Sequence, residues 1–191
     1  MKKLSLIVIC SLFIFNQVLA FTYSSDPKIF VTELVNDAIS KLSDKNISKE
    51  EKKEFIEKIA LENVDINALG LYTLGEVRKS TDKDLLLKFQ NSFTKYFLKS
   101  LTSRLTDYSN NKFEVISADK KSVNYTIVKS KILESENQPE IKIDWRIYTK
   151  NPDKPLVRDL IVEGLSLART QKEEFSSILS SNNNDINILI S

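Results

Sequence analysis

The segment Arg158–Leu179, RDLIVEGLSLARTQKEEFSSIL, joins a strand-like sequence directly to a helix-like one. Its first part, up to Val162, is apolar and β-branched, which is typical of a strand. In its second part, Thr170 and Glu173 have the spacing of a capping box, which predicts a helix start at this position.

Gly164 lies at the junction and is one of only three glycines in the 191-residue chain. A glycine at a strand end predicts either a sharp change of direction or a close backbone approach. Ser166 follows it and is placed to accept an N–H from the next turn. We therefore expect Glu163-Gly164-Leu165-Ser166 to set how the last helix leans on the sheet.

A two-residue period precedes this junction and predicts four strands. Ile141, Ile143, Trp145 and Ile147 share one strand face, whereas charged residues alternate with them on the other. Short connections, among them Asp119-Lys120-Lys121, favour an antiparallel meander with one buried face. The predicted strands span residues 112–119, 122–133, 140–150 and 156–164.

Helical patterns come before these strands. Asp26-Pro27 and the capping box at Ser48 predict two helix starts, and residues 65–74 read as a short third helix. A longer helix with a strong apolar stripe is predicted to begin near Thr81. Helices segregated around such a sheet predict an α+β domain: a four-stranded antiparallel sheet packed by N-terminal and C-terminal helices.

The N-terminus, MKKLSLIVICSLFIFNQVLA, has the charged start, short apolar run and small C-terminal residues of a secretory signal peptide. We expect residues 1–20 to be removed and residues 21–191 to form a single exported domain. Residues 1–20 carry two lysines and no acidic residue, so the mature chain has 26 basic and 26 acidic residues. This balance provides no overall electrostatic case for nucleic acid or an anionic membrane as a bulk partner.

The residues available for catalysis are few. The chain has no histidine, and its one cysteine, Cys10, leaves with the signal peptide, which excludes histidine-dependent nucleophiles and histidine-ligated metal sites. Asp159 and Glu163 are the remaining candidates for a paired-carboxylate mechanism. If Leu160 and Val162 face the interior, alternation turns both carboxylates outward. We therefore expect no enzyme, no catalytic residue and no metal or cofactor. A carboxylate-based hydrolase and a small exported adaptor protein remain as alternatives.

The C-terminal region resembles the signature of the MlaC family, the toluene-tolerance-type periplasmic phospholipid carriers. The resemblance extends over about residues 26–180 and includes the upstream segment ENVDINALGLYTLG and the aromatic-rich helix that follows it. The residues that carry it are Asp159, Ile161, Glu163, Gly164, Leu165, Ser166, Leu167, Thr170, Lys172 and Phe175.

The resemblance implies that the four-stranded sheet is curved and that the helices pack on it around an apolar cavity. It also implies a monomeric carrier that hides a phospholipid's acyl chains and shuttles the lipid across the periplasm, maintaining outer-membrane lipid asymmetry. Its implied partners are an inner-membrane ABC transporter complex with an MCE-domain ring and an outer-membrane lipoprotein–porin complex. The phospholipid is cargo and not a cofactor. We predict that the apolar pocket is lined by Phe30, Leu34, Phe55, Ile59, Leu69, Phe89, Phe93, Tyr125, Ile143, Trp145, Ile147, Leu160 and Val162.

Overall fold

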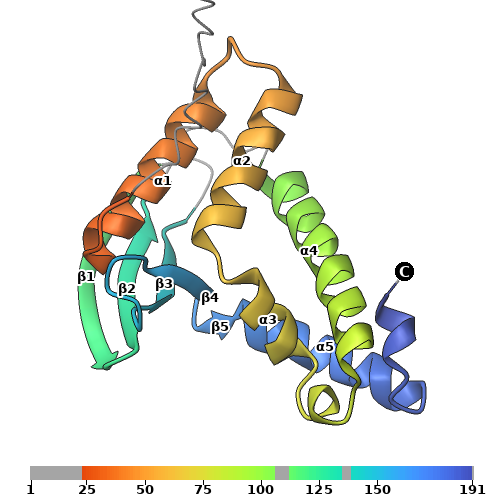
Figure 1. Cartoon of the computed structure of the whole chain (residues 1–191). Coiled ribbons are helices and arrows are strands. Elements are labelled where there is room, and N and C mark those ends of the chain that lie inside the picture. Colours follow the sequence, from red (N-terminus) through yellow and green to blue (C-terminus); the bar gives the residue numbers. More distant parts are fainter. Residues whose placement is uncertain (1–22, 106–111, 135–138, 191) are drawn as a thin grey trace, which may run out of the picture.

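The computed structural model describes residues 23–105, 112–134 and 139–190. Within them the chain forms an α+β fold in which α1 covers the sheet, α3, α4 and α5 form a helical half, and α2 lies between the two (Figure 1). The helices are α1 Pro27–Ser43, α2 Lys49–Asn63, α3 Ile66–Thr73, η1 Val77–Lys79, α4 Lys83–Leu105, α5 Leu167–Ser181 and η2 Ile186–Leu189. The strands are β1 Phe113–Ser122, β2 Tyr125–Ile132, β3 Ile141–Tyr148, β4 Leu156–Val162 and β5 Leu165–Ser166.

The first three helices begin at the residues that their sequence predicts. The Asp26 carboxylate accepts the Lys28 and Ile29 N–H groups at 2.9 and 3.0 Å, and Pro27 follows it. Ser48 caps α2 in a complete capping box with Glu51. Such caps satisfy backbone donors that the helix cannot pair itself, and each contributes about 1 kcal/mol to stability.

The sheet is an antiparallel meander of five strands in the order β1-β2-β3-β4-β5, one more than predicted. Trp145 lies opposite Val128 on one side and Leu160 on the other, so Trp145 and its alternating neighbours share one face as expected. The predicted turn at residues 119–121 is wrong, because β1 continues to Ser122. The polar residues at the end of β1 lie in an exposed strand and not in a turn.

The fifth strand exists because of the turn at Glu163-Gly164. Glu163 has φ 49° and Gly164 has φ 83°, and two successive positive φ angles are the signature of a type I′ hairpin turn. The turn folds Leu165 back to pair with Val162. A Cβ built on Gly164 would meet nothing within 4 Å, so no neighbouring atom requires a glycine here. The positive φ angle is what favours glycine at this position.

Replacing Gly164 tests this explanation. We expect Gly164→Val to lower the free energy of unfolding by about 1–2 kcal/mol, because a β-branched residue is strained at positive φ. Gly164→Asn is the matched control and should cost less than half as much, since asparagine tolerates the left-handed region. Urea denaturation of the two variants and the wild type measures the difference. Equal stability of Val and Asn variants would contradict the turn assignment.

Helix α5 begins four residues earlier than predicted. Ser166 is its N-cap, and the Ser166 Oγ accepts the Arg169 N–H at 3.0 Å, as its position suggested. The capping box expected at Thr170 is wrong: the Thr170 hydroxyl donates to the Ser166 carbonyl at 3.1 Å inside the first turn. The hairpin therefore leads directly into the helix.

Two separate apolar clusters stabilise the fold. The sheet-side cluster lies between α1, α2 and the inner face of the sheet, and its buried members are Phe30, Val31, Leu34, Leu42, Ile56, Ile59, Val128, Ile147 and Val157. The helical cluster lies among α3, α4, α5 and η2, with buried members Ile66, Leu74, Phe89, Phe93, Leu179 and Ile186. Of the residues that the structure describes, Val64 alone packs against both clusters.

Candidate functional site

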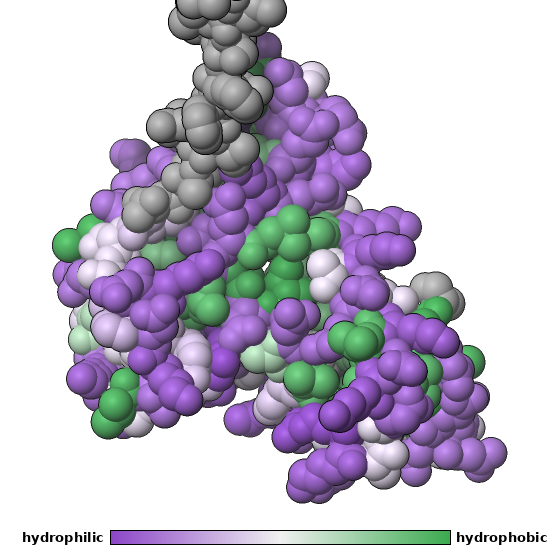
Figure 2. All heavy atoms as spheres, viewed as in Figure 1, coloured by the Kyte–Doolittle hydropathy of each residue, from purple (hydrophilic) through white to green (hydrophobic). Residues whose placement is uncertain are grey.

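The region between the two clusters is hollowed and apolar. Figure 2 shows hydrophobic residues gathered around a hollow in the middle of this face, where Figure 1 places the C-terminal end of α2 beside α4. The apolar side chains around the two clusters are only partly buried. Those of the sheet include Phe113, Trp145 and Leu160. We refer to this region between the sheet-side and helical clusters as the apolar cleft.

Helix α4 connects the two clusters. Its residues Leu101 and Leu105 pack against the sheet-side cluster, whereas Phe97 and Leu98 pack against the helical cluster. All four are only partly buried, so each keeps apolar surface that the protein's own side chains do not cover. These residues were not among the predicted pocket residues. The stripe of α4 continues through them at helical spacing, and this was the signal that could have identified them.

Trp145 is held in a defined position on the sheet. Its Nε1–H donates to the Ser130 Oγ at 2.9 Å, and the Ser130 hydroxyl donates to the Ile143 carbonyl at 2.8 Å. The Phe113 and Trp145 rings meet edge to face at 84°, with centroids 6.3 Å apart. Because the indole N–H is satisfied within the sheet, the ring provides a fixed apolar surface beside the cleft.

The structure divides the predicted pocket residues by their burial. Six are buried in the two clusters: Phe30, Leu34, Ile59, Phe89, Phe93 and Ile147. The others are partly buried: Phe55, Leu69, Tyr125, Ile143, Trp145, Leu160 and Val162. Tyr125 lies across from Tyr148, on the sheet face opposite Trp145, and is not brought together with the others.

On that opposite face, Arg158 ties the sheet to the junction between α2 and α3. Its Nε and Nη2 donate to Asp65 Oδ2 at 2.8 and 2.7 Å, and its Nη1 donates to the Tyr125 hydroxyl at 2.8 Å. The guanidinium also lies 3.4 Å from the Tyr148 ring centroid. Burial acts to lower the pKa of Arg158, but Tyr125 and Asp65 outweigh it and leave that pKa raised. This cluster fixes β4 next to Val64, where the two apolar clusters meet.

We expect Arg158→Lys to lower the free energy of unfolding by about 1–2 kcal/mol. A lysine keeps the positive charge, but its single ammonium group cannot replace all the contacts of the guanidinium. These are two bonds to Asp65, one to the Tyr125 hydroxyl, and the stacking on the Tyr148 ring. Arg146→Lys is the matched control, because the Arg146 guanidinium makes only a 3.9 Å contact with Asp159, and it should cost under about 0.5 kcal/mol. Thermal and urea unfolding of both variants measure the difference. A cost for Arg158→Lys no larger than that of the control would contradict this role.

Asp159 lies on the sheet face opposite Leu160, as the alternation predicted, but it is not exposed to solvent. Only 4% of its surface is exposed, because the start of α5 covers it. Its carboxylate accepts the Ser166 hydroxyl at 2.6 Å and the Ala168 N–H at 3.0 Å. Glu163, by contrast, is exposed at the turn and accepts the Lys142 N–H. Each carboxylate thus has a structural partner, and the two do not converge on one site.

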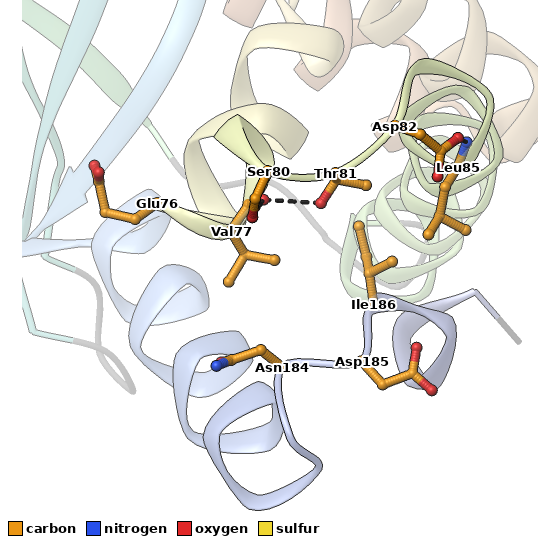
Figure 3. Close-up of a pocket in the computed structure, with 9 residues that line it drawn as sticks. All are labelled: Glu76, Val77, Ser80, Thr81, Asp82, Leu85, Asn184, Asp185 and Ile186. Atoms are coloured by element: carbon orange, nitrogen blue, oxygen red, sulfur yellow. Dashed lines mark hydrogen bonds between the residues drawn. The ribbon is translucent and has the colours of Figure 1, made fainter.

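A second hollow of about 450 Å³ lies between η1, the start of α4 and η2 (Figure 3). Three carboxylates line it, but Figure 3 shows Glu76, Asp82 and Asp185 on separate sides. Asp82 and Asp185 accept backbone N–H groups at the starts of α4 and η2. Over residues 23–105, 112–134 and 139–190, no group of three or more His, Cys, Asp or Glu side chains could hold a metal ion. In the same residues no helix meets the length and hydropathy needed to cross a membrane.

Comparisons with known proteins identify a matching family and a solved structure with a similar fold. The family model described as MlaC protein matches residues 32–191. No curated protein sequence matches the chain. A solved structure of the phospholipid-binding protein from Ralstonia solanacearum, in complex with a phospholipid, has the same fold with a TM-score of 0.66 at 16% identity, covering 80% of this chain and 87% of that one. Since the family model covers most of the sequence, the chain belongs to the MlaC family.

Proposed function

We propose that this protein is a periplasmic phospholipid carrier that holds acyl chains in the apolar cleft and shuttles the lipid between inner-membrane and outer-membrane complexes. The observation that carries the proposal is the division of the apolar residues into two clusters that meet at Val64, with partly buried apolar side chains on facing elements. Family membership and the phospholipid in the related solved structure support the same cargo.

The energetics favour a lipid over a small polar ligand. Two typical acyl chains contain about 30 methylenes, and burying each one is worth roughly 0.8 kcal/mol, so a cleft that covered the chains would gain over about 20 kcal/mol. No headgroup contact approaches this value. Release into water is correspondingly unfavourable, whereas transfer into another apolar site is nearly balanced. The carrier therefore needs partners at both membranes, and we propose the ABC transporter complex with its MCE-domain ring and the lipoprotein–porin complex.

Export follows from the expected signal peptide, residues 1–20, which lies outside the described residues. We propose that the mature chain acts as a monomer without catalytic activity. The capping role of Asp159 and the exposed position of Glu163 support this, because neither side chain is placed beside the cleft as a free acid or base.

The test is to purify the mature protein without detergent and measure bound lipid by solvent extraction and native mass spectrometry. We expect close to one phospholipid per chain. A protein that purifies empty and takes up no phospholipid from vesicles would refute lipid carriage and would favour a non-lipid adaptor.

A further inference from the structure

Helix α4 presents a basic face to solvent. It contains five cationic residues and a single carboxylate, Asp84. Lys88, Lys95 and Lys99 are spaced by seven and four residues, which places their side chains on one side of the helix, and all three are exposed. None of the three forms an ion pair with another residue that the structure describes. We call these three lysines the basic face of α4.

The other side of the same helix is apolar and packed. Phe89 and Phe93 are buried in the helical cluster, and Leu101 lies beside the apolar cleft. Figure 1 shows α4 on the side of the helical half away from the sheet, with η2 beside the N-terminal end of the helix. From Lys88 to Lys99 the face is roughly 16 Å long at 1.5 Å per residue. One helix therefore borders the cleft and carries an unpaired positive surface.

We propose that the basic face of α4 docks the carrier on the anionic headgroups of a phospholipid membrane, with the helix lying along the surface. The inference rests on the proposed function, because a membrane is where the cargo is collected or delivered. With basic and acidic residues balanced in the mature chain, the net charge provides no attraction. A lysine close to an anionic bilayer gains about 1 kcal/mol, and α4 brings three of them to the same side.

Two details favour a membrane over an acidic protein. Lysine ammonium groups are flexible point charges, which suit a mobile array of headgroups better than a fixed carboxylate geometry. Leu87 is 58% exposed and lies about 100° from Lys88 around the helix, so an apolar side chain borders the basic face where the headgroup layer would begin.

The experiment uses the full mature chain carrying Lys88→Gln, Lys95→Gln and Lys99→Gln together. Glutamine keeps the helix propensity and removes the charge. Binding is measured by co-sedimentation with vesicles of phosphatidylcholine alone, or with about one third phosphatidylglycerol, at about 0.15 M salt. We expect the wild type to bind only the anionic vesicles, and the triple variant to bind them roughly tenfold to a hundredfold more weakly.

The matched control replaces three exposed lysines far from α4 in sequence, with Lys45→Gln, Lys150→Gln and Lys154→Gln. It has the same net charge as the test variant and should bind as the wild type does. An equal loss in both triple variants would overturn the proposal, because net charge would then explain the binding. Normal vesicle binding by the test variant would also overturn the proposal. If that variant then received lipid poorly from a protein donor, the basic face would bind an acidic protein and not a membrane.

Bound lipid per chain is measured in the same preparations to separate this proposal from the proposed function. We expect the same lipid content in the wild type and both triple variants, because none of the replaced residues contributes to the two clusters. A wild type without lipid would refute carriage, whatever the vesicle assay shows. A wild-type protein that contains lipid but does not bind anionic vesicles would refute membrane docking and leave the proposed lipid carriage standing.

Discussion

Leu101→Asp is expected to abolish phospholipid binding. Leu101 is a partly buried residue of α4 that packs against the sheet-side cluster, next to the apolar cleft. An acyl chain in the cleft would have to desolvate the new carboxylate, which costs several kcal/mol. Since each 1.4 kcal/mol is a factor of ten, we expect affinity to fall at least about a hundredfold. Lipid per purified chain, by extraction and native mass spectrometry, should drop to near zero.

Leu61→Asp is the matched control for this experiment. Leu61 is 56% exposed on α2, so the same substitution there changes charge and helix propensity without adding a charge to either cluster. It should retain the lipid content of the wild type. Circular dichroism of both variants checks that they are folded. A folded Leu101→Asp variant that purifies with normal lipid content would place the acyl chains elsewhere.

Asp159→Ala is expected to lower the free energy of unfolding by about 2–4 kcal/mol. The substitution leaves the Ala168 N–H and the Ser166 hydroxyl without their acceptor, and unsatisfied buried donors each cost about 1–3 kcal/mol. The junction between β4 and the first turn of α5 would lose the contact that connects them. Urea denaturation, with a slope that stays constant between variants, measures the effect.

Two further variants separate the parts of this contact. Asp159→Asn keeps one acceptor oxygen and should cost about half as much as alanine. Ser166→Ala removes the cap of α5 but leaves the carboxylate bonded to the Ala168 N–H, and should cost about 1 kcal/mol. We expect the asparagine variant to keep its lipid, as a structural carboxylate should. A cost below about 0.5 kcal/mol for Asp159→Ala would contradict the structural role.

The sequence by itself determined the features that depend on neighbouring residues. Caps at Asp26 and Ser48 start helices because the interaction lies within one turn, and the two-residue alternation around Trp145 identified a sheet face without any knowledge of its partners. The α+β class follows from the order of these patterns. Gly164 marked the turn, since its residue type reports a local backbone angle.

Only the tertiary structure decided which neighbours these elements meet. Asp159 is buried because α5 starts beside it, and Arg158 reaches Asp65, 93 residues earlier in the chain. Likewise, an apolar stripe is the same whether a side chain or a fatty acid covers it. Phe89 is enclosed within the helical cluster and Leu101 is left partly uncovered, although both belong to one helical stripe. That difference depends on how the two clusters are placed in space, which residue spacing does not encode.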